Sequence, residues 1–247
     1  KCLDFSSNDY LALAQDPRLV EASVEWTRIY GSGSRASRLV TGTFEPYLEV
    51  ERKIAAWKGT EAAIIIGSGY LANTGIIPAL ADRSSSIFAD KLNHASLNAG
   101  AILSGAGFKR YRHLDFKHLE GFLHEDSSPG RIIISDTVFS MDGDLADVGG
   151  LSRIAGANRA LLYLDDAHAT GVFGERGEGL ASSADDRTVA MGTFSKAMGS
   201  YGAYAACSAE MKEYLVNKCP SFIYSTALPP GNRSEERRVG KECRSRW

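Results

Sequence analysis

The sequence predicts an α/β fold with three layers, in which helices cover both faces of a mostly parallel central sheet. Short apolar segments rich in β-branched residues alternate with stretches of helical periodicity along the 247 residues. Each apolar segment is followed by a polar or glycine-rich turn, and in parallel sheets such turns lie where ligands bind. With 44% apolar and 23% charged residues, the chain has enough material for one large core.

The elements are expected in a regular order along the chain. A first strand is predicted at 64–66, and the turn at 67–70 then leads into a helix that begins near Leu71. Further strands are predicted at 86–89, 131–136, 160–165 and 189–193. Helices are predicted at 45–58, 93–104 and 115–125. Because parallel strands are joined by right-handed crossovers, their carboxyl ends are expected to meet at one edge of the sheet.

Composition and charge exclude several classes of protein. The formal charge of −2 and the pI near 6.3 give no overall attraction to nucleic acid or to an anionic membrane. No run approaches the roughly 18 to 20 apolar residues of a membrane span, and the first residues do not resemble a signal peptide. The cysteines lack the spacing of a zinc site or a disulfide framework. We therefore expect a cytoplasmic protein without a metal site, whose partners are small molecules or proteins.

Three parts are expected along the chain. Residues 1–30 form an N-terminal segment, which starts at Lys1 without a methionine and is interpreted as a truncated arm. Residues 31–230 form the large domain, which contains all the predicted strands. Residues 231–247 are interpreted as a non-native or disordered tail, because from Arg233 onward six basic residues stand against three acidic ones with almost no apolar periodicity.

Lys196 and Asp165 are the strongest candidates for catalysis, because each lies at the end of an apolar segment. Lys196 follows a predicted strand among small residues and hydroxyls, where a lysine can lose enough hydration to act as an amine. Asp165 closes its strand and offers an anion. Together they supply what pyridoxal phosphate requires, an amine for its aldehyde and a carboxylate that keeps its ring protonated. A lone lysine in a loop is otherwise a surface residue.

Two neighbours of Asp165 bear on the same site. Asp166 is the alternative acid, and Asp165 is preferred because it closes the apolar segment. His168 is placed to hydrogen-bond the phenolic oxygen of the cofactor or to orient Asp165. An Asp-x-x-His pair is also typical of a metal site or a helix N-cap, although no further cluster with metal spacing supports a metal.

Weaker candidates follow other predicted strands. His94 has a ring of the kind that stacks on a flat cofactor, although taken alone it indicates a structural histidine. The backbone amides of Gly69 and Tyr70, with the hydroxyl of Ser68, offer an anion cradle at the start of a helix. Ser140 precedes a turn that either faces the same pocket or is a plain turn.

Seven ordered motifs resemble those of a known family. They are FSSNDYL at 5–11, GSGSRASRLVTG at 31–42, NHASL at 93–97, FSMDGD at 139–144, DDAHATG at 165–171, GTFSKAMGSYG at 192–202 and YSTALPP at 224–230. Over nearly everything from Leu3 to Pro230 the chain resembles the α-oxoamine synthases, which are fold-type I pyridoxal phosphate enzymes. The resemblance implies a fold-type I large domain with pyridoxal phosphate as its cofactor.

The resemblance also implies a role for each matching residue. Lys196 would form the Schiff base with the cofactor, Asp165 would pair with the pyridinium, and His94 would stack on the ring. The other implied contacts are His168 and Ser140 near the phenolic oxygen, Gly69, Tyr70 and Thr193 at the phosphate, Ser225 and Thr226 at the phosphate of the neighbouring subunit, and Asn8 near the substrate. A homodimer with shared active sites follows from the same resemblance.

Within the family, the motifs look most like those of the members that join L-alanine to a pimeloyl thioester in biotin biosynthesis. That reaction uses either a coenzyme A or a carrier-protein thioester and releases carbon dioxide and the free thiol. Glycine C-acetyltransferase is the nearest alternative, followed by the aminolevulinate and sphingolipid-type enzymes.

One departure from the family opens a different interpretation. The family continues with a smaller carboxyl-terminal α/β domain, including an arginine that holds the amino-acid carboxylate, and the sequence contains no counterpart of that domain. An inactive cofactor-binding fragment is therefore a second interpretation. A third, a nucleotide-binding domain, rests on GSG turns alone and lacks both the GxGxxG motif and the P-loop lysine spacing.

Overall fold

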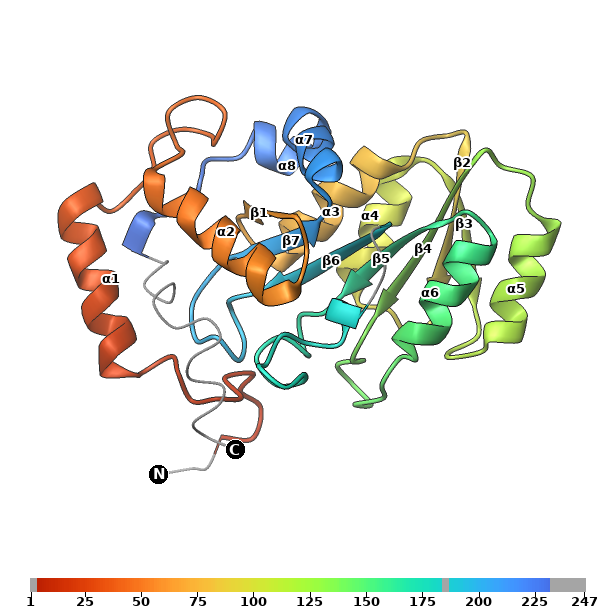
Figure 1. Ribbon diagram of the computed structural model, residues 1–247, viewed down its shortest axis with the longest axis horizontal. Coiled ribbons are helices and arrows are strands. Elements are labelled where there is room, and N and C mark those ends of the chain that lie inside the picture. Colours follow the sequence, from red (N-terminus) through yellow and green to blue (C-terminus); the bar gives the residue numbers. More distant parts are fainter. Residues whose placement is uncertain (1–3, 184–186, 232–247) are drawn as a thin grey trace.

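The computed structural model describes residues 4–183 and 187–231, and within them a seven-stranded sheet has the order β1-β7-β6-β5-β4-β2-β3 (Figure 1). Its strands are β1 (Ala62–Ile66), β2 (Ser85–Asp90), β3 (Gly107–Tyr111), β4 (Gly130–Asp136), β5 (Leu161–Asp165), β6 (Thr188–Thr193) and β7 (Ala203–Cys207). β7 runs antiparallel to both of its neighbours, and every other pair is parallel. The mostly parallel sheet predicted from the sequence is confirmed.

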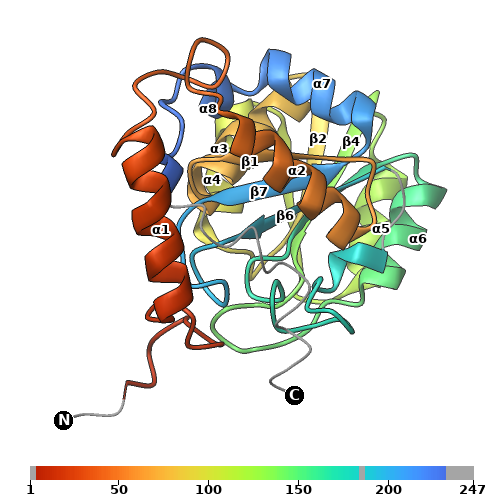
Figure 2. The same ribbon diagram turned by 60° about the vertical axis from the view of Figure 1, so that its left-hand side comes forward.

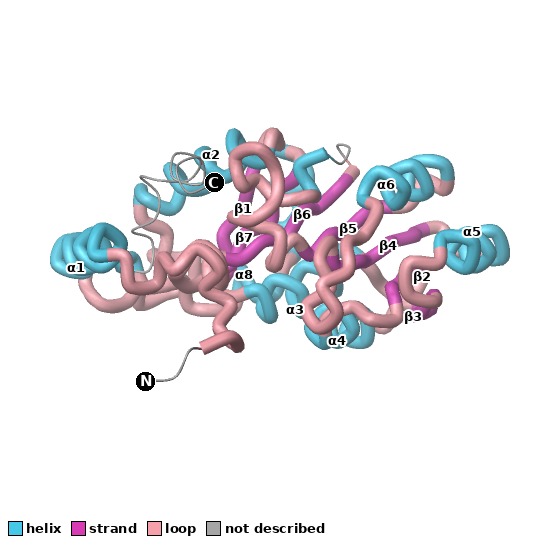
Figure 3. Tube along the Cα trace, turned by 90° about the horizontal axis from the view of Figure 1, so that it is seen from below, coloured by secondary structure: helices cyan, strands magenta, loops and turns pink. Residues whose placement is uncertain are grey.

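Helices cover the two faces of this sheet, which gives the three expected layers. They are α1 (Pro17–Tyr30), α2 (Glu45–Lys58), α3 (Gly69–Leu80), α4 (Ala95–Ser104), α5 (Phe116–Glu125), α6 (Val148–Ala157), α7 (Ala209–Lys218) and α8 (Pro220–Ile223), with a short 3₁₀ turn at Ala181–Ser183. Figure 3 shows α5 and α6 on one side of the sheet and α3 and α4 on the other. In Figure 2, α1 lies apart from the sheet. No described helix is both long enough and apolar enough to cross a membrane.

The core divides into two apolar clusters, one on each face of the sheet. In β1, Ile64 and Ile66 belong to the cluster that includes Ile76 of α3, whereas Ile65 belongs to the cluster that includes Ile54 of α2. This division follows from the alternation of side chains along a strand. Strands that are buried on both faces are apolar throughout, which is why their segments were recognisable in the sequence.

Two strands are absent from the sequence-based prediction. β3 reads GFKRY and has only one buried residue, because it lies at the edge of the sheet. β7 reads AYAAC, and its small alanines have little preference for a strand even though all five residues are buried. The predicted start of α3 near Leu71 is also late. Ser68 caps this helix through its Oγ, which accepts a hydrogen bond from the Leu71 N–H at 3.2 Å, so the helix begins at Gly69.

Of the three predicted parts of the chain, the tail lies outside the described residues except for Gly231. The boundary at residue 30 coincides with the end of α1. The division into parts stays a prediction.

Candidate active site

The carboxyl ends of the parallel strands bring the predicted residues to one edge of the sheet. β4 ends at Asp136, β5 at Asp165 and β6 at Thr193, and Asp136 is paired with Asp165 in the strand register. β1 also points toward this edge, because it is antiparallel to β7, which is itself antiparallel to β6. The turn that leads from β1 to Gly69 therefore lies at the same edge as Lys196, three residues beyond the end of β6.

Lys196 is half-buried in a tight turn after β6. The Lys196 carbonyl accepts a hydrogen bond from the Gly199 N–H at 2.9 Å. Gly199 has a φ of +69°, and a Cβ there would lie 2.5 Å from the Ala14 nitrogen, so the turn requires glycine. Burial lowers the pKa of Lys196, although the negative charges of Asp165 and Asp136 act in the opposite direction. A buried amine whose pKa is lowered is available as a nucleophile or a base.

Asp165 is buried, with only 4% of its surface exposed, and both of its carboxylate oxygens are engaged. Oδ2 accepts a hydrogen bond from Asn73 Nδ2 at 2.7 Å, and Oδ1 accepts one from the Ala167 N–H at 3.0 Å. Burial raises the pKa of Asp165, while the bond from Asn73 and the charge of Lys196 lower it. The cost of burying the Asp165 carboxylate is therefore only partly offset by its hydrogen bonds and by the charge of Lys196.

Asp166, the alternative acid, is engaged elsewhere. Its Oδ2 lies 2.6 Å from Nζ of Lys58, and both side chains are fully buried. Its Oδ1 accepts a hydrogen bond from Thr137 Oγ1 at 2.7 Å. This pairing favours Asp165 as the acid that remains available to a ligand.

His168 contacts the amino-terminal segment. Its Nδ1 lies 2.7 Å from the Tyr10 hydroxyl, and that hydroxyl donates its proton to Asn8 Oδ1 at 3.0 Å. These contacts bring Asn8 next to His168, from which it is far removed in sequence. Burial lowers the pKa of His168 to about 4, with further contributions from Lys196 and His94. The structure thus bonds His168 to Tyr10, and Asp165 is oriented by Asn73 instead.

The first turn of α3 and the end of β6 are in close contact. A Cβ on Gly69 would lie 2.7 Å from Cγ2 of Thr193, so only glycine fits there without a shift. Thr193 Oγ1 is buried and has no hydrogen-bond partner within the described residues. Tyr70, the next residue of α3, is 56% exposed. A buried hydroxyl without a partner beside a helix N-terminus is suited to an anion.

His94 caps the start of α4 with an exposed ring. Its Nδ1 lies 2.6 Å from Ser96 Oγ, and its backbone N–H donates to Asp136 Oδ2 at 2.7 Å. Burial raises the pKa of Asp136 well above its usual value, and the charge of Asp165 raises it further. Sequence reasoning missed Asp136, although its position at the end of the predicted strand 131–136 was a signal for it.

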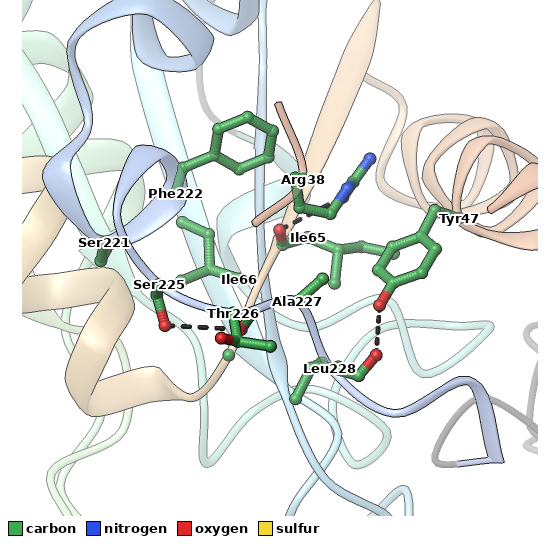
Figure 4. Close-up of a pocket in the computed structure, with 11 residues that line it drawn as sticks. Arg38, Tyr47, Ile65, Ile66, Ser221, Phe222, Ser225, Thr226, Ala227 and Leu228 are labelled. Atoms are coloured by element: carbon green, nitrogen blue, oxygen red, sulfur yellow. Dashed lines mark hydrogen bonds between the residues drawn. The ribbon is translucent and has the colours of Figure 1, made fainter. Parts of the chain in front are cut away.

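The remaining candidates lie farther from this cluster. Ser140 is exposed in the loop after β4, which is closed by an isolated bridge between Val138 and Leu145. Ser225 and Thr226 line a small pocket with Arg38 and with Ile66 at the end of β1 (Figure 4). The described contacts do not join either of them to Lys196.

Arg38, which lines this pocket, is held by an ion pair and by two aromatic rings. The guanidinium donates to Glu51 Oε1 at 2.7 Å and lies over the rings of Tyr47 and Phe222, at 4.4 and 5.2 Å from their centroids. An isolated bridge pairs Ser37 with Thr226. Segment 224–228 is thus held against the loop of the GSGSRASRLVTG motif.

A model of the class I and II aminotransferases matches residues 1–233. The chain belongs to the class I and II aminotransferase family. Among its curated relatives in this family, the 8-amino-7-oxononanoate synthase of Gluconacetobacter diazotrophicus is 50% identical over 238 residues, which cover 93% of this chain and 60% of that protein. A putative 8-amino-7-oxononanoate synthase of Bacillus cereus is 51% identical over 236 residues, which cover 94% of this chain and 60% of that protein. The chain thus spans about 60% of the length of these relatives.

Solved structures of class I and II aminotransferase fold agree with the chain over nearly all of its length. A serine palmitoyltransferase with a pyridoxal phosphate internal aldimine has a TM-score of 0.90 at 29% identity, covering 97% of this chain and 61% of that one. The 8-amino-7-oxononanoate synthase of Francisella tularensis has a TM-score of 0.85 at 30% identity, covering 99% of this chain and 70% of that one. The predicted fold-type I class and the resemblance to the α-oxoamine synthases are confirmed.

Pyridoxal phosphate is the cofactor that the family and its PLP-bound neighbours indicate, and the residues at the sheet edge fit it. The buried hydroxyl of Thr193 has no partner among the described residues and lies beside the first turn of α3, where a phosphate is favoured. Asp165 is a buried anion that a protonated pyridine nitrogen would neutralise, and Lys196 is an amine with a lowered pKa. The described residues contain no group of three or more side chains placed to hold a metal ion.

The lowered pKa of His168 predicts a pH dependence of stability. In unfolded protein a histidine has a pKa of about 6.5. Between that value and the native pKa of about 4, the unfolded chain binds a proton that the native protein does not, so stability is expected to fall as the pH drops through this window. Urea unfolding at pH 7 and pH 5 should show a smaller loss for His168→Gln than for the unmodified protein. His124→Gln, at an exposed position of α5, is the matched control, and an equal loss in all three proteins would contradict the prediction.

Proposed function

We propose that this chain is the cofactor-binding part of an 8-amino-7-oxononanoate synthase, a pyridoxal phosphate-dependent acyltransferase. The reaction joins L-alanine to a pimeloyl thioester, of coenzyme A or a carrier protein, and releases carbon dioxide and the free thiol. The observation that carries the proposal is the identity of about 50% to synthases of that name over 93% of the chain. A location in the cytoplasm stays a prediction that accords with this function.

Bound pyridoxal phosphate supplies an electron sink for the electrons left at the α-carbon of an amino acid. Asp165 would pair with the pyridine nitrogen, and this ion pair would offset the cost of burying the carboxylate. Lys196 would hold the cofactor through Nζ, and the same amine would take the α-proton and later return it. The lowered pKa of Lys196 favours the neutral amine that this step needs.

The other residues position the cofactor and the substrate. His94 would stack on the cofactor ring with its exposed imidazole, and His168 would hydrogen-bond near the phenolic oxygen, as would Ser140 from the loop after β4. Backbone groups of Gly69 and Tyr70, with the unpartnered hydroxyl of Thr193, would bind the phosphate. Asn8 would approach the substrate, and it is held by a hydrogen bond from Tyr10, whose hydroxyl also contacts His168.

The site is shared between two subunits of a homodimer in this proposal. Ser225 and Thr226 would reach the phosphate of the neighbouring subunit. Support comes from the position of these residues, which line a small pocket with Arg38 and Gly67, while no described contact joins them to Lys196 of their own subunit.

The test uses the product of the whole gene, purified with pyridoxal phosphate. L-Alanine with pimeloyl-CoA is expected to give 8-amino-7-oxononanoate, identified by mass spectrometry together with stoichiometric release of free thiol. Glycine with acetyl-CoA is the decisive comparison. A higher kcat/KM for that pair would assign the protein to the glycine C-acetyltransferases, and a protein that never binds pyridoxal phosphate would refute both assignments.

Thr193→Val is expected to affect stability and cofactor binding in opposite directions. Removing a buried hydroxyl that has no partner relieves a desolvation cost of about 1–3 kcal/mol, so the cofactor-free protein should melt at a higher temperature. The same change removes a hydrogen-bond donor to the phosphate and should weaken binding of pyridoxal phosphate. Thermal melting and an absorbance titration measure the two effects. A variant that is destabilised and binds the cofactor as before would contradict this role for Thr193.

A further inference from the structure

A continuous chain of hydrogen bonds joins the buried acid of the proposed active site to the histidine beside it. The Tyr163 hydroxyl donates to Asn73 Oδ1 at 2.8 Å. Asn73 Nδ2 donates to Asp165 Oδ2 at 2.7 Å and to Ser96 Oγ at 2.8 Å. Ser96 Oγ lies 2.6 Å from His94 Nδ1. The chain links α3, β5 and the start of α4, so it connects three separate elements through one amide.

The orientation of the Asn73 amide follows from its partners. An ionised carboxylate only accepts hydrogen bonds, so the nitrogen of the amide must face Asp165. Its second N–H is then directed to Ser96, and its oxygen is left for Tyr163. Tyr163 is completely buried, and burial keeps its pKa well above the usual value, so its hydroxyl retains the proton that it donates. Every donor and acceptor of the Asn73 side chain has a partner.

The donor and acceptor roles assigned at Asn73 also determine those at the imidazole of His94. Ser96 Oγ accepts from Asn73, and its own proton is therefore free to point at His94 Nδ1. The backbone N–H of Ser96 points at the same nitrogen, at 3.3 Å. Because two donors face Nδ1, that nitrogen accepts, and in the neutral imidazole the proton resides on Nε2.

The burial of this chain makes its geometry costly to change. Asn73 and Ser96 are each 1% exposed and Tyr163 is fully buried, so water does not replace a lost partner. Asn73 also provides one of the two hydrogen bonds that fix the Asp165 carboxylate, the other coming from the Ala167 N–H. Asn73 of α3 therefore bonds Asp165 directly and reaches the His94 ring through Ser96, and both Asp165 and His94 are proposed to contact the cofactor.

We propose that Asn73 is a positioning residue that orients the Asp165 carboxylate and, through Ser96, holds His94 in the tautomer protonated at Nε2. The inference rests on the proposed function for its significance to catalysis, because Asp165 and His94 are the residues assigned to the cofactor ring. The orientation of Asp165 and the tautomer of His94 are properties of the protein without cofactor, and they can be measured without any activity. Failure of the proposed function and failure of this inference are therefore distinguishable.

The test is made on cofactor-free protein labelled with ¹⁵N-histidine and ¹³C-aspartate. In the unmodified protein, the His94 signals are expected to show an unprotonated Nδ1 and a protonated Nε2. Ser96→Ala leaves only the backbone N–H of Ser96, at 3.3 Å, facing His94 Nδ1, so it should give a mixture of the two His94 tautomers and leave the Asp165 titration unchanged. Asn73→Leu should also disturb the tautomer, and it should shift the midpoint of the Asp165 titration upward. Lys196, Asp136 and His94 act on that carboxylate as well, and all three remain in both variants.

Controls separate positioning from general damage to the fold. Ser96→Thr retains the hydroxyl and should restore the His94 tautomer that Ser96→Ala loses. Asn217→Ala removes an exposed asparagine from α7 and should leave both signals unchanged. If Asn73→Leu does not fold, Ser96→Ala and Ser96→Thr still test whether Ser96 holds the His94 tautomer. Unchanged His94 signals in Ser96→Ala, or an unchanged Asp165 titration in folded Asn73→Leu, would overturn the proposal.

Discussion

Lys196→Ala is expected to abolish covalent attachment of pyridoxal phosphate to this protein. Lys196 is half-buried at the edge of the sheet where the parallel strands end, and burial lowers its pKa, which favours the neutral amine that attacks an aldehyde. Lys58, which is fully buried among the described residues, is paired with Asp166, so it is not available to replace Lys196. Borohydride reduction followed by mass spectrometry of the peptides measures the attachment. In the whole-gene product, loss of the base at Nζ should lower kcat on the order of 10²–10⁴-fold.

The matched control for this experiment is Lys117→Ala, an exposed lysine of α5. It should retain both the reduced adduct and the absorbance of the bound cofactor. An adduct of unchanged yield in Lys196→Ala, found on another lysine, would refute the assignment. Loss of the adduct in both variants would show that the chemistry does not depend on Lys196 alone.

The sequence predicted the candidate residues that lie at or just after the ends of strands. Asp165 and Lys196 were recognisable because each follows an apolar segment, and the carboxyl ends of neighbouring parallel strands meet at one edge. The same argument located Gly69 at the end of β1 and His94 after β2. Predictions of this kind succeed because a strand buried on both faces has an unmistakable apolar pattern and because the topology then fixes where its end lies.

Residues that act through contacts across elements were not predictable in the same way. Asn73 lies inside α3, where an asparagine has no local signature, and its role depends on its packing against β5 and α4. Tyr10 is part of the FSSNDYL motif, yet only the fold brings its hydroxyl to His168. These residues are defined by their partners, and the partners come from distant parts of the chain.

The second large effect is expected from Lys58→Met, which removes a charge and preserves the apolar stem. Lys58 Nζ lies 2.6 Å from Asp166 Oδ2 and also donates to the Glu178 carbonyl. Burial disfavours the charge of Lys58, but Asp166 more than compensates and raises its pKa above the usual value. In the variant, Asp166 would be left buried without a counter-ion. Breaking such a pair costs about 3–5 kcal/mol, which for a domain of this size lowers Tm by roughly 6–20 °C.

The cause of that loss is tested by removing the second charge as well. In Lys58→Met combined with Asp166→Asn, the amide oxygen can still accept the hydrogen bond from Thr137, and no unpaired charge remains. The double variant should therefore melt above Lys58→Met alone, since the penalty arises from the orphaned carboxylate and not from the lost contact. Lys53→Met breaks an exposed pair with Glu49 in the same helix and should cost about 0.3–0.5 kcal/mol. If the double variant is no more stable than Lys58→Met, removing the unpaired charge has restored no stability. The loss in Lys58→Met would then come from the packing of the Lys58 side chain in α2 and not from the orphaned carboxylate.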